Sequence, residues 1–152
     1  MQTRVHMTQN NHPSKKTVIV AGCTRLGAEL ALRMDTNGYP VVVVDPQKLA
    51  LDQLDRSFGG IVVQGEATDP DVLLQCAVKE AGLLFSVFDD DATNLLVGRI
   101  AKTIFHVPFV QIRLENASNR SILAGTGIDV ICPAEILSTQ IMADLKMLEV
   151  TA

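Results

Sequence analysis

Residues 17–27 read TVIVAGCTRLG, and this stretch decides the fold class. Its first five residues are β-branched or small and apolar, a composition that favours a buried strand. Gly22 and Gly27 occupy the first and last glycine positions of a G-x-G-x-x-G loop, in which a strand turns sharply into a helix. Because the unpaired amides at the start of such a helix attract phosphate oxygens, the stretch predicts a strand, loop and helix that together bind a phosphate group.

The rest of the chain repeats this alternation of short apolar runs with helix-length stretches, as a parallel sheet with crossover helices requires. We predict six strands, at Thr17–Ala21, Val41–Asp45, Ile61–Gln64, Leu83–Phe88, Phe109–Arg113 and Asp129–Ile131. Crossover connections between parallel strands are nearly always right-handed. The expected fold is therefore α/β, with a Rossmann-like, doubly wound, six-stranded parallel sheet in the order 3-2-1-4-5-6.

Three segments are expected along the chain: a disordered polar lead-in at 1–16, one nucleotide-binding domain at 17–133, and an amphipathic helix within 134–152. Met7 is a possible alternative start to Met1. The helix is predicted at Glu135–Leu148, and its apolar side chains gather on one side. Two interpretations stay open for it. It either folds back onto its own sheet or forms a crossover, as a dimer seam or a docking face for another chain.

Leu96, Ile100 and Ile104 recur every four residues before the fifth predicted strand. This spacing predicts that the three side chains form the buried stripe of a helix.

The composition excludes several classes of protein. With 13 basic against 17 acidic side chains and a pI near 5.3, the chain has no positive field for binding nucleic acid or an anionic membrane. No apolar run approaches the roughly 18 residues of a membrane-spanning helix, so direct membrane insertion is not expected. The three cysteines are odd in number and form no CxxC pair, which argues against disulfides or a zinc site and predicts a cytoplasmic location.

The phosphate loop carries Thr24 where a dinucleotide loop has its middle glycine. That glycine lets the backbone approach a pyrophosphate, and a threonine places a side chain there. Thr24 therefore favours a mononucleotide over NAD, unless the loop binds nothing. Arg25 is placed to reach a β- or γ-phosphate, although it could also be a solvated residue at the helix start.

Asp45 ends the second predicted strand, 23 residues after Gly22 (45 − 22). A carboxylate at about this spacing accepts hydrogen bonds from the two ribose hydroxyls of an adenosine. Its charge repels a 2′-phosphate, which makes NADP unlikely. The alternative is that Asp45 only caps the next helix.

Two further segments narrow the choice of family. Residues 65–69 read GEATD and follow the third predicted strand, and residues 89–95 read DDDATNL and follow the fourth. With the loop at 22–27 and the acidic end of the second strand, they resemble the Trk/Ktr N-terminal regulatory domain. This domain, also called RCK, KTN or TrkA-N, belongs to bacterial potassium uptake systems and channels. The resemblance runs from about Thr17 to Pro133.

The resemblance implies a bound adenine nucleotide, AMP, ADP or ATP, with NAD(H) possible. It implies ligand contacts from four groups of residues: Gly22, Cys23, Thr24, Arg25, Leu26 and Gly27; Asp45 and Pro46; Gly65, Glu66, Ala67 and Thr68; Asp89, Asn94 and Arg113. Three residues depart from the family pattern. Thr24 replaces glycine, Glu66 replaces the usual aspartate, and Phe88 stands where a small polar residue is common.

The same resemblance implies a homodimer or a higher homo-oligomer. It further implies a membrane potassium transporter subunit as partner, with a separately encoded regulatory chain as another candidate. The protein would then be cytoplasmic and peripheral to the inner membrane. A nucleotide-sensing regulatory subunit is the expected function, and a small NAD-dependent oxidoreductase or a free-standing nucleotide-binding adaptor are the alternatives.

No catalytic residue and no metal site are expected. Tyr39 has Val43 where a Tyr-x-x-x-Lys pair needs lysine, and His106 is interpreted as a helix cap. Cys23 is either a redox-sensitive thiol or a small filler. The run Asp89–Asp91 suits a hard cation, but consecutive residues cannot all point at one ion, so helix capping is the favoured interpretation.

Overall fold

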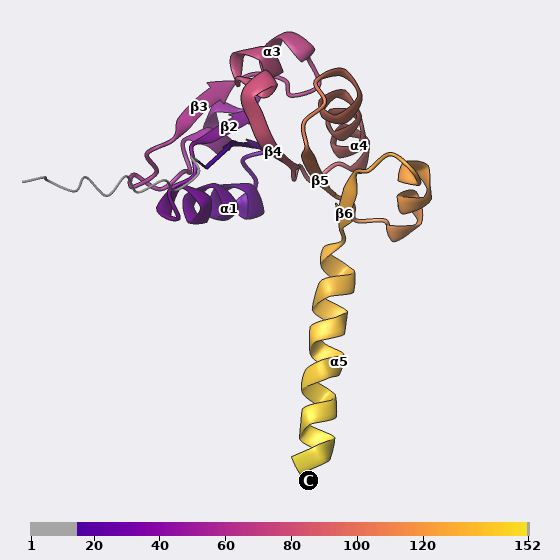
Figure 1. The fold of residues 1–152 in the computed structure, drawn as a ribbon. Coiled ribbons are helices and arrows are strands. Elements are labelled where there is room, and N and C mark those ends of the chain that lie inside the picture. The colour runs from indigo at the N-terminus through magenta and orange to yellow at the C-terminus, as the bar shows by residue number, and fades with distance from the viewer. Residues whose placement is uncertain (1–14, 152) are drawn as a thin grey trace, which may run out of the picture.

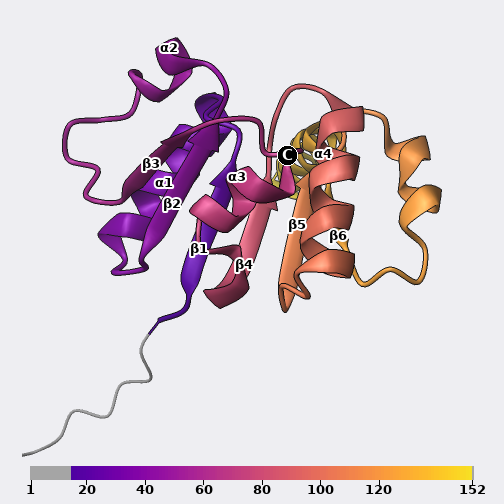
Figure 2. The ribbon, with the colours of Figure 1, turned by 90° about the horizontal axis from the view of Figure 1, so that it is seen from above.

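The computed structural model describes residues 15–151 and contains one six-stranded parallel sheet (Figures 1 and 2). Its order is β3-β2-β1-β4-β5-β6, so the predicted fold class and strand order are confirmed. The predicted lead-in at 1–16 lies almost wholly outside the described residues. The strands are β1 Thr17–Ala21, β2 Val41–Asp45, β3 Ile61–Gln64, β4 Ala81–Ser86, β5 Phe109–Arg113 and β6 Asp129–Ile131.

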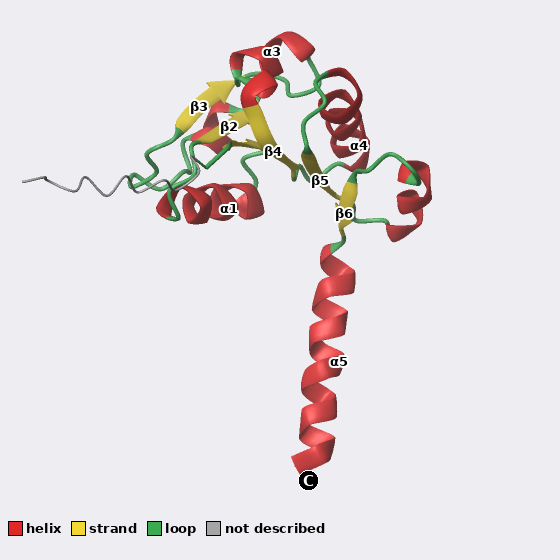
Figure 3. Ribbon diagram, in the orientation of Figure 1, coloured by secondary structure: helices red, strands yellow, loops and turns green. Residues whose placement is uncertain are grey.

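Figure 3 shows the helices that connect these strands. The α-helices are α1 Arg25–Thr36, α2 Lys48–Leu51, α3 Pro70–Gln75, α4 Asp91–Arg99 and α5 Pro133–Thr151. Shorter turns complete the chain: 3-10 turns at Val78–Glu80 and Ala117–Leu123, and a π-helical turn at Ile100–Ile104 that continues α4.

The central strands are covered on both faces, with α1 on one side of the sheet and α3 and α4 on the other, whereas the edge strand β3 is largely exposed (Figure 1). Alternate side chains of β1 therefore enter two different cores. Val18 and Val20 pack with Ala31 of α1, while Ile19 packs with Leu73 of α3. A strand buried on both faces needs no polar residue, which explains why β1 and β2 are continuous apolar runs.

Strand β4 differs from its predicted bounds, Leu83–Phe88, which are wrong by two residues at each end. It begins earlier because Ala81 pairs with Thr17 at the start of β1. It ends earlier because the side chain of Asn94 bonds both backbone polar groups of Phe88. Phe88 therefore leaves the sheet and enters the loop before α4.

The predicted buried stripe of α4 is wrong at two of its three positions. Ile100 is buried, but Leu96 and Ile104 are 49% and 56% exposed. The buried side is formed instead by Asn94 and Val97. Since the helix continues as a π-helical turn from Ile100, a regular four-residue spacing does not describe its inner face.

Helix α5 projects away from the sheet, and none of its residues is buried (Figure 1). The helix does not fold back onto its own sheet, so the first of its two predicted interpretations is wrong. Its base is joined to the body by an ion pair between Arg120 and Glu135, with 2.7 Å between Nη2 and Oε2. Within residues 15–151, no helix is both long and apolar enough to cross a membrane.

Candidate functional site

A cavity of about 400 Å³ opens at the carboxyl ends of β1, β2 and β4. It lies where β1 has β2 on one side and β4 on the other, the position at which open parallel sheets bind ligands. Three segments line it: Cys23 and Thr24 after β1; Asp45, Pro46, Gln47 and Ala50 at the end of β2 and in α2; Phe88, Asp89, Asp90 and Thr93 around the start of α4.

Asp45 is the buried carboxylate of this cavity, at 5% exposure. The backbone N–H of Cys23 donates to its Oδ2 at 2.8 Å, and that of Gln47 donates to its Oδ1 at 2.8 Å. Each oxygen keeps a second lone pair, because a carboxylate can accept about four hydrogen bonds. Asp45 therefore joins two loops of the cavity and can still accept hydrogen bonds from a ligand. The bond from Gln47, the residue before α2, is also the contact expected if Asp45 only caps this helix.

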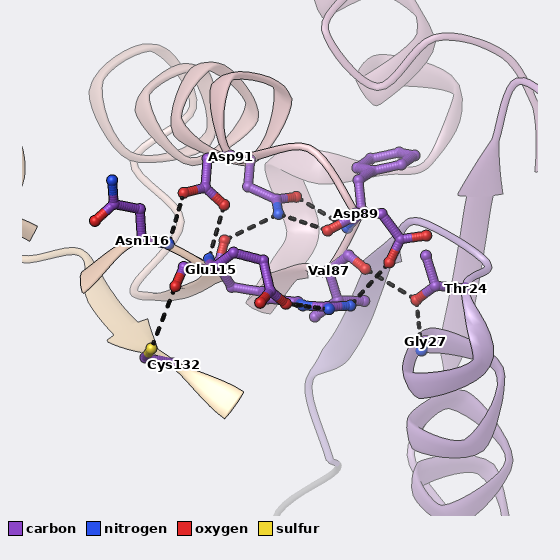
Figure 4. A network of polar contacts seen from close by, with 11 residues as sticks. Thr24, Gly27, Val87, Asp89, Asp91, Glu115, Asn116 and Cys132 are labelled. Carbon is purple, nitrogen blue, oxygen red and sulfur yellow. Dashed lines mark hydrogen bonds and ion pairs between the residues drawn. The ribbon is translucent and has the colours of Figure 1, made fainter. Parts of the chain in front are cut away.

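Thr24 is the N-cap of α1 and joins the two sides of the cavity (Figure 4). Its Oγ1 accepts from the Gly27 N–H at 3.2 Å and donates to the Val87 carbonyl at 2.9 Å. The loop after β1 is thus bonded directly to the end of β4. Gly27 must be a glycine, because a Cβ there would overlap the Gly22 carbonyl oxygen.

Amides at the start of α1 are available for an anion. The first four N–H groups of a helix have no partner of the usual helical kind, and here they belong to Thr24, Arg25, Leu26 and Gly27. The Thr24 hydroxyl accepts a hydrogen bond from the Gly27 N–H, while the Ala28 N–H makes the first regular helical bond to the Thr24 carbonyl. The amide of Thr24 therefore remains, together with those of Arg25 and Leu26. The side chains of Arg25 and Leu26 are exposed and lie outside the cavity wall.

Asn94 is fully buried behind the loop that follows β4. Its Oδ1 accepts from the Ser86 hydroxyl and from the Phe88 N–H, each at 2.9 Å. Its Nδ2 donates to the carbonyls of Phe88, at 2.8 Å, and Arg113, at 2.9 Å (Figure 4). These four bonds use both donors and both lone pairs of the amide. Asn94 therefore holds the ends of β4 and β5 together and places Phe88 and Asp89 at the cavity.

The three consecutive acids after β4 have three different partners. Asp89 Oδ1 accepts from Arg113 Nη1 at 3.0 Å. Asp90 caps α4 by accepting from the hydroxyl and N–H of Thr93, and these two bonds hold its pKa below the ordinary value. Asp91 accepts from the N–H of Glu115. The capping interpretation is confirmed for Asp90, and the described residues contain no cluster of three or more acids, histidines or cysteines able to hold a metal.

Arg113 lies at the end of β5, beside the cavity but not in its wall. Its guanidinium is only 18% exposed and is paired with both Asp89 and Glu115. The hydrogen bond with Glu115, opposed in part by burial, raises the pKa of Arg113 above its usual value. The cation is therefore held between two carboxylates (Figure 4).

The segment after β3 lies at the same edge of the sheet without lining the cavity. The Gly65 N–H donates to the Asp45 carbonyl at 3.1 Å, so this segment is anchored next to the buried carboxylate. Glu66 is exposed, Ala67 is buried in the core, and Thr68 is partly buried.

A comparison with models of protein families identifies the family of this domain. The model of the TrkA-N domain matches residues 18–133, most of the chain. The chain belongs to the TrkA-N family. This match agrees with the resemblance that the loop, the end of β2 and the two later motifs predicted.

Curated relatives of this TrkA-N domain are potassium transport proteins. The Trk system potassium uptake protein TrkA of Streptomyces coelicolor is 28% identical over 128 residues, which cover 84% of this chain and 57% of that protein. Potassium channel protein 1 of Methanocaldococcus jannaschii is 29% identical over 126 residues, with 82% and 36% covered. The chain thus spans little more than half, or less, of the relatives it matches.

Solved structures share the fold. The TrkA-N domain of the inner membrane protein ybaL of Escherichia coli has a TM-score of 0.77 at 16% identity, covering 86% of this chain and 97% of that one. The GsuK channel bound to NAD has a TM-score of 0.75 at 22% identity, covering 90% and 24%. The Kef CTD of Shewanella denitrificans in its AMP-bound form has a TM-score of 0.67 at 23% identity, covering 87% and 81%. GsuK is also known bound to ADP.

The cavity of this TrkA-N domain brings together part of the predicted contact set. Cys23, Thr24, Asp45, Pro46 and Asp89 line it. Ten predicted residues lie outside its wall: Gly22, Arg25, Leu26, Gly27, Gly65, Glu66, Ala67, Thr68, Asn94 and Arg113. The prediction missed four lining residues, Gln47, Ala50, Asp90 and Thr93, and doubted a contact from a fifth, Phe88. Each of the five lies within five residues of Asp45 or Asp89. This closeness in sequence to a predicted site residue is the only signal from which they could have been predicted.

Cys23 lines the cavity as a buried thiol at 2% exposure. Burial, and then the charge of Asp45, raise its pKa to about 11. A thiol with a raised pKa is a poor nucleophile at neutral pH, because the thiolate is the reactive form. Of the two predicted interpretations, the structure favours the small filler over the redox-sensitive thiol.

Proposed function

We propose that this chain is the nucleotide-sensing part of a potassium transport system and binds an adenine nucleotide in the cavity beside Asp45. The observation that carries the proposal is the state of Asp45. The carboxylate is buried, is oriented by two backbone N–H groups, and still has lone pairs free on the cavity side. A buried carboxylate is costly unless hydrogen bonds satisfy it, and the two N–H groups use only part of its capacity, so this arrangement fits a site for paired hydroxyls.

In this proposal the ribose hydroxyls donate to Asp45, and the adenine lies toward Pro46 and Gly65–Thr68. The phosphate meets the amides of Arg25 and Leu26, where the positive end of the α1 dipole lies. The side chains of Arg25 and Arg113 lie outside the cavity wall, and Arg113 is already paired with Asp89 and Glu115. Gly22 and Gly27 serve the same site indirectly, because they let the loop turn and pack closely enough to present those amides.

The bond between Thr24 and Val87 favours a mononucleotide. A dinucleotide crosses from the first strand of such a sheet to the fourth, over the loop that has glycine at its middle position. Here the threonine side chain and its hydrogen bond stand on that route. We therefore expect AMP, ADP or ATP to bind better than NAD(H). NADP should bind worst, because its 2′-phosphate would meet the Asp45 carboxylate. Relatives bound to NAD, ADP and AMP support an adenine ligand.

The proposed output passes through α5, whose apolar side chains are exposed over its whole length. A second copy of the chain is the proposed occupant of that surface, giving a homodimer or higher homo-oligomer. This assembly would act on a membrane potassium transporter subunit, directly or through a separately encoded regulatory chain, from the cytoplasmic side. A nucleotide regulates such an assembly only if it binds two arrangements of the subunits with different affinity.

A thermal-shift panel of AMP, ADP, ATP, NAD, NADH and NADP tests the proposal. Ligand at 100 times its dissociation constant adds about 2.7 kcal/mol to the free energy of unfolding, which gives a clear rise in Tm. We expect adenine mononucleotides to raise Tm most and NADP least. Asp45→Asn should abolish the rise, while Asp55→Asn, at an exposed acid that does not line the cavity, should keep it.

Three results would contradict the proposal in different ways. No shift with any nucleotide would remove the sensing function. A preference for NAD(H) over every mononucleotide would remove the argument from Thr24. Turnover of a nicotinamide substrate by the chain would support the oxidoreductase alternative.

A further inference from the structure

The wall of the cavity is acidic. It includes the carboxylates of Asp45, Asp89 and Asp90, and none of the described residues that line it is basic. Asp45 is buried, whereas the side chain of Asp89 is 81% exposed at the mouth. A ligand in this cavity therefore meets negative charge on two sides, from the end of β2 and from the loop before α4.

The cations near the cavity do not offset this charge. Arg113 is held between Asp89 and Glu115, so two carboxylates already face its single positive charge. Arg25 begins α1 with its side chain exposed and outside the wall.

The two helices that begin at the cavity offer few free donors. The start of α4 is capped by Asp90, which takes the N–H and the hydroxyl of Thr93 and adds a negative charge at the positive end of the helix. At the start of α1, the Thr24 hydroxyl already accepts from the Gly27 N–H. The amides of Thr24, Arg25 and Leu26 remain, and they suffice for the oxygens of one phosphate group.

From this arrangement we propose that the cavity selects among adenine nucleotides by charge and takes the nucleoside monophosphate in preference to the di- and triphosphate. One phosphate is bound by the amides of Arg25 and Leu26. A second or third phosphate finds no cation in the wall and lies among the carboxylates of Asp89 and Asp90. The inference rests on the proposed function and names the ligand class within it.

Isothermal titration calorimetry with adenosine, AMP, ADP and ATP tests the proposal on the full chain. At low salt and without divalent cations, we expect AMP to bind most tightly. Each added phosphate should weaken binding by about three- to tenfold, because it adds repulsion with a few carboxylates that are partly exposed to solvent. The differences should shrink as the salt concentration rises, because the repulsion is screened. Adding Mg²⁺ should recover part of the ATP affinity by offsetting phosphate charge.

Two substitutions locate the source of the selection. Asp90→Asn removes one charge and keeps the helix cap, because asparagine caps helices as well as aspartate. Asp89→Asn removes another and leaves Arg113 with one carboxylate instead of two. Each should narrow the gap between ATP and AMP by about threefold or more. Asp144→Asn removes the same charge from α5, far from the cavity, and should leave the gap unchanged.

The outcomes separate this inference from the proposed function. ATP binding more tightly than AMP without a divalent cation would overturn charge selection while leaving nucleotide sensing intact. The same holds if the Asp89 and Asp90 variants keep the full gap, or if adenosine binds as tightly as AMP. Binding of none of the four ligands would overturn both.

Discussion

The sheet and helix α5 use apolar side chains in opposite ways. Val18, Ile19 and Val20 of β1 have no exposed surface, and both faces of the strand are covered by helices of the same chain. In α5, by contrast, Ile141 is 65% exposed and Leu148 is 67% exposed. Both segments are rich in apolar residues, but only the first buries them within the chain.

This difference separates the apolar residues that stabilise the body of the protein, which is the sheet with its covering helices, from those that are available to bind another molecule. Most of the stability of a helix in a protein comes from packing against other elements, and no residue of α5 is buried by such packing. The apolar surface of α5 therefore contributes little to folding of the isolated chain and is free to be buried against a partner. Substitutions in the sheet and its covering helices should therefore change the free energy of unfolding, whereas substitutions in α5 should change assembly.

Asn94→Ala should have the largest effect on unfolding. It removes four hydrogen bonds, leaving the fully buried Ser86 hydroxyl without its acceptor and partly buried backbone groups of Phe88 and Arg113 without their partner. Each unsatisfied buried group costs about 1–3 kcal/mol, so we expect a loss of about 3 kcal/mol in urea unfolding. Asn37→Ala, which removes one exposed hydrogen bond at the end of α1, serves as the control and should lose much less. A loss of equal size in the two variants would contradict the role given to Asn94.

Gly27→Ala should have the next largest effect, about 2 kcal/mol in the same measurement. The new Cβ overlaps the Gly22 carbonyl oxygen, so the loop and the start of α1 must move apart. Gly59→Ala is a matched control, since the nearest atom to its added Cβ is an Asp35 carboxylate oxygen at 3.5 Å. If Gly27→Ala were as stable as Gly59→Ala, the close packing of the phosphate loop would be wrong.

Replacing Ile141 and Leu145 of α5 together by glutamine should change the free energy of unfolding of the body least, by less than about 0.5 kcal/mol. The same double variant should sediment as a monomer under conditions where the natural chain sediments as a dimer or larger. Lys146→Gln keeps the apolar surface and should leave assembly unchanged. A monomeric natural chain would refute the proposed homo-oligomer.

Local pattern was enough to predict most of the sheet. Strands β1 and β2 are buried on both faces, so each is an apolar run that ends at a glycine or a polar residue. In all, five of the six strands have the predicted bounds. The exception is β4, where Val87 and Phe88 continue the run. The strand ends there because of hydrogen bonds from Asn94, and hydrophobicity carries no information about those bonds.

The helices and the site were less predictable for a related reason. The π-helical turn after α4 changes which residues face inward, and no single spacing anticipates it. The bond from Thr24 to the Val87 carbonyl joins residues 63 positions apart, so the effect of the loop threonine on the far side of the cavity needed the structure. Asn94 was expected to contact a ligand, whereas its four bonds go to the protein itself.

The way Asp45 is held has a consequence for the speed of the proposed sensor. Since the carboxylate is already fixed by Cys23 and Gln47, the ligand does not have to order these loops when it binds. Association then requires no slow rearrangement, and the lifetime of the complex is set by dissociation alone. A sensor built in this way takes up its ligand without first rearranging, so it answers a rise in nucleotide concentration without a conformational delay.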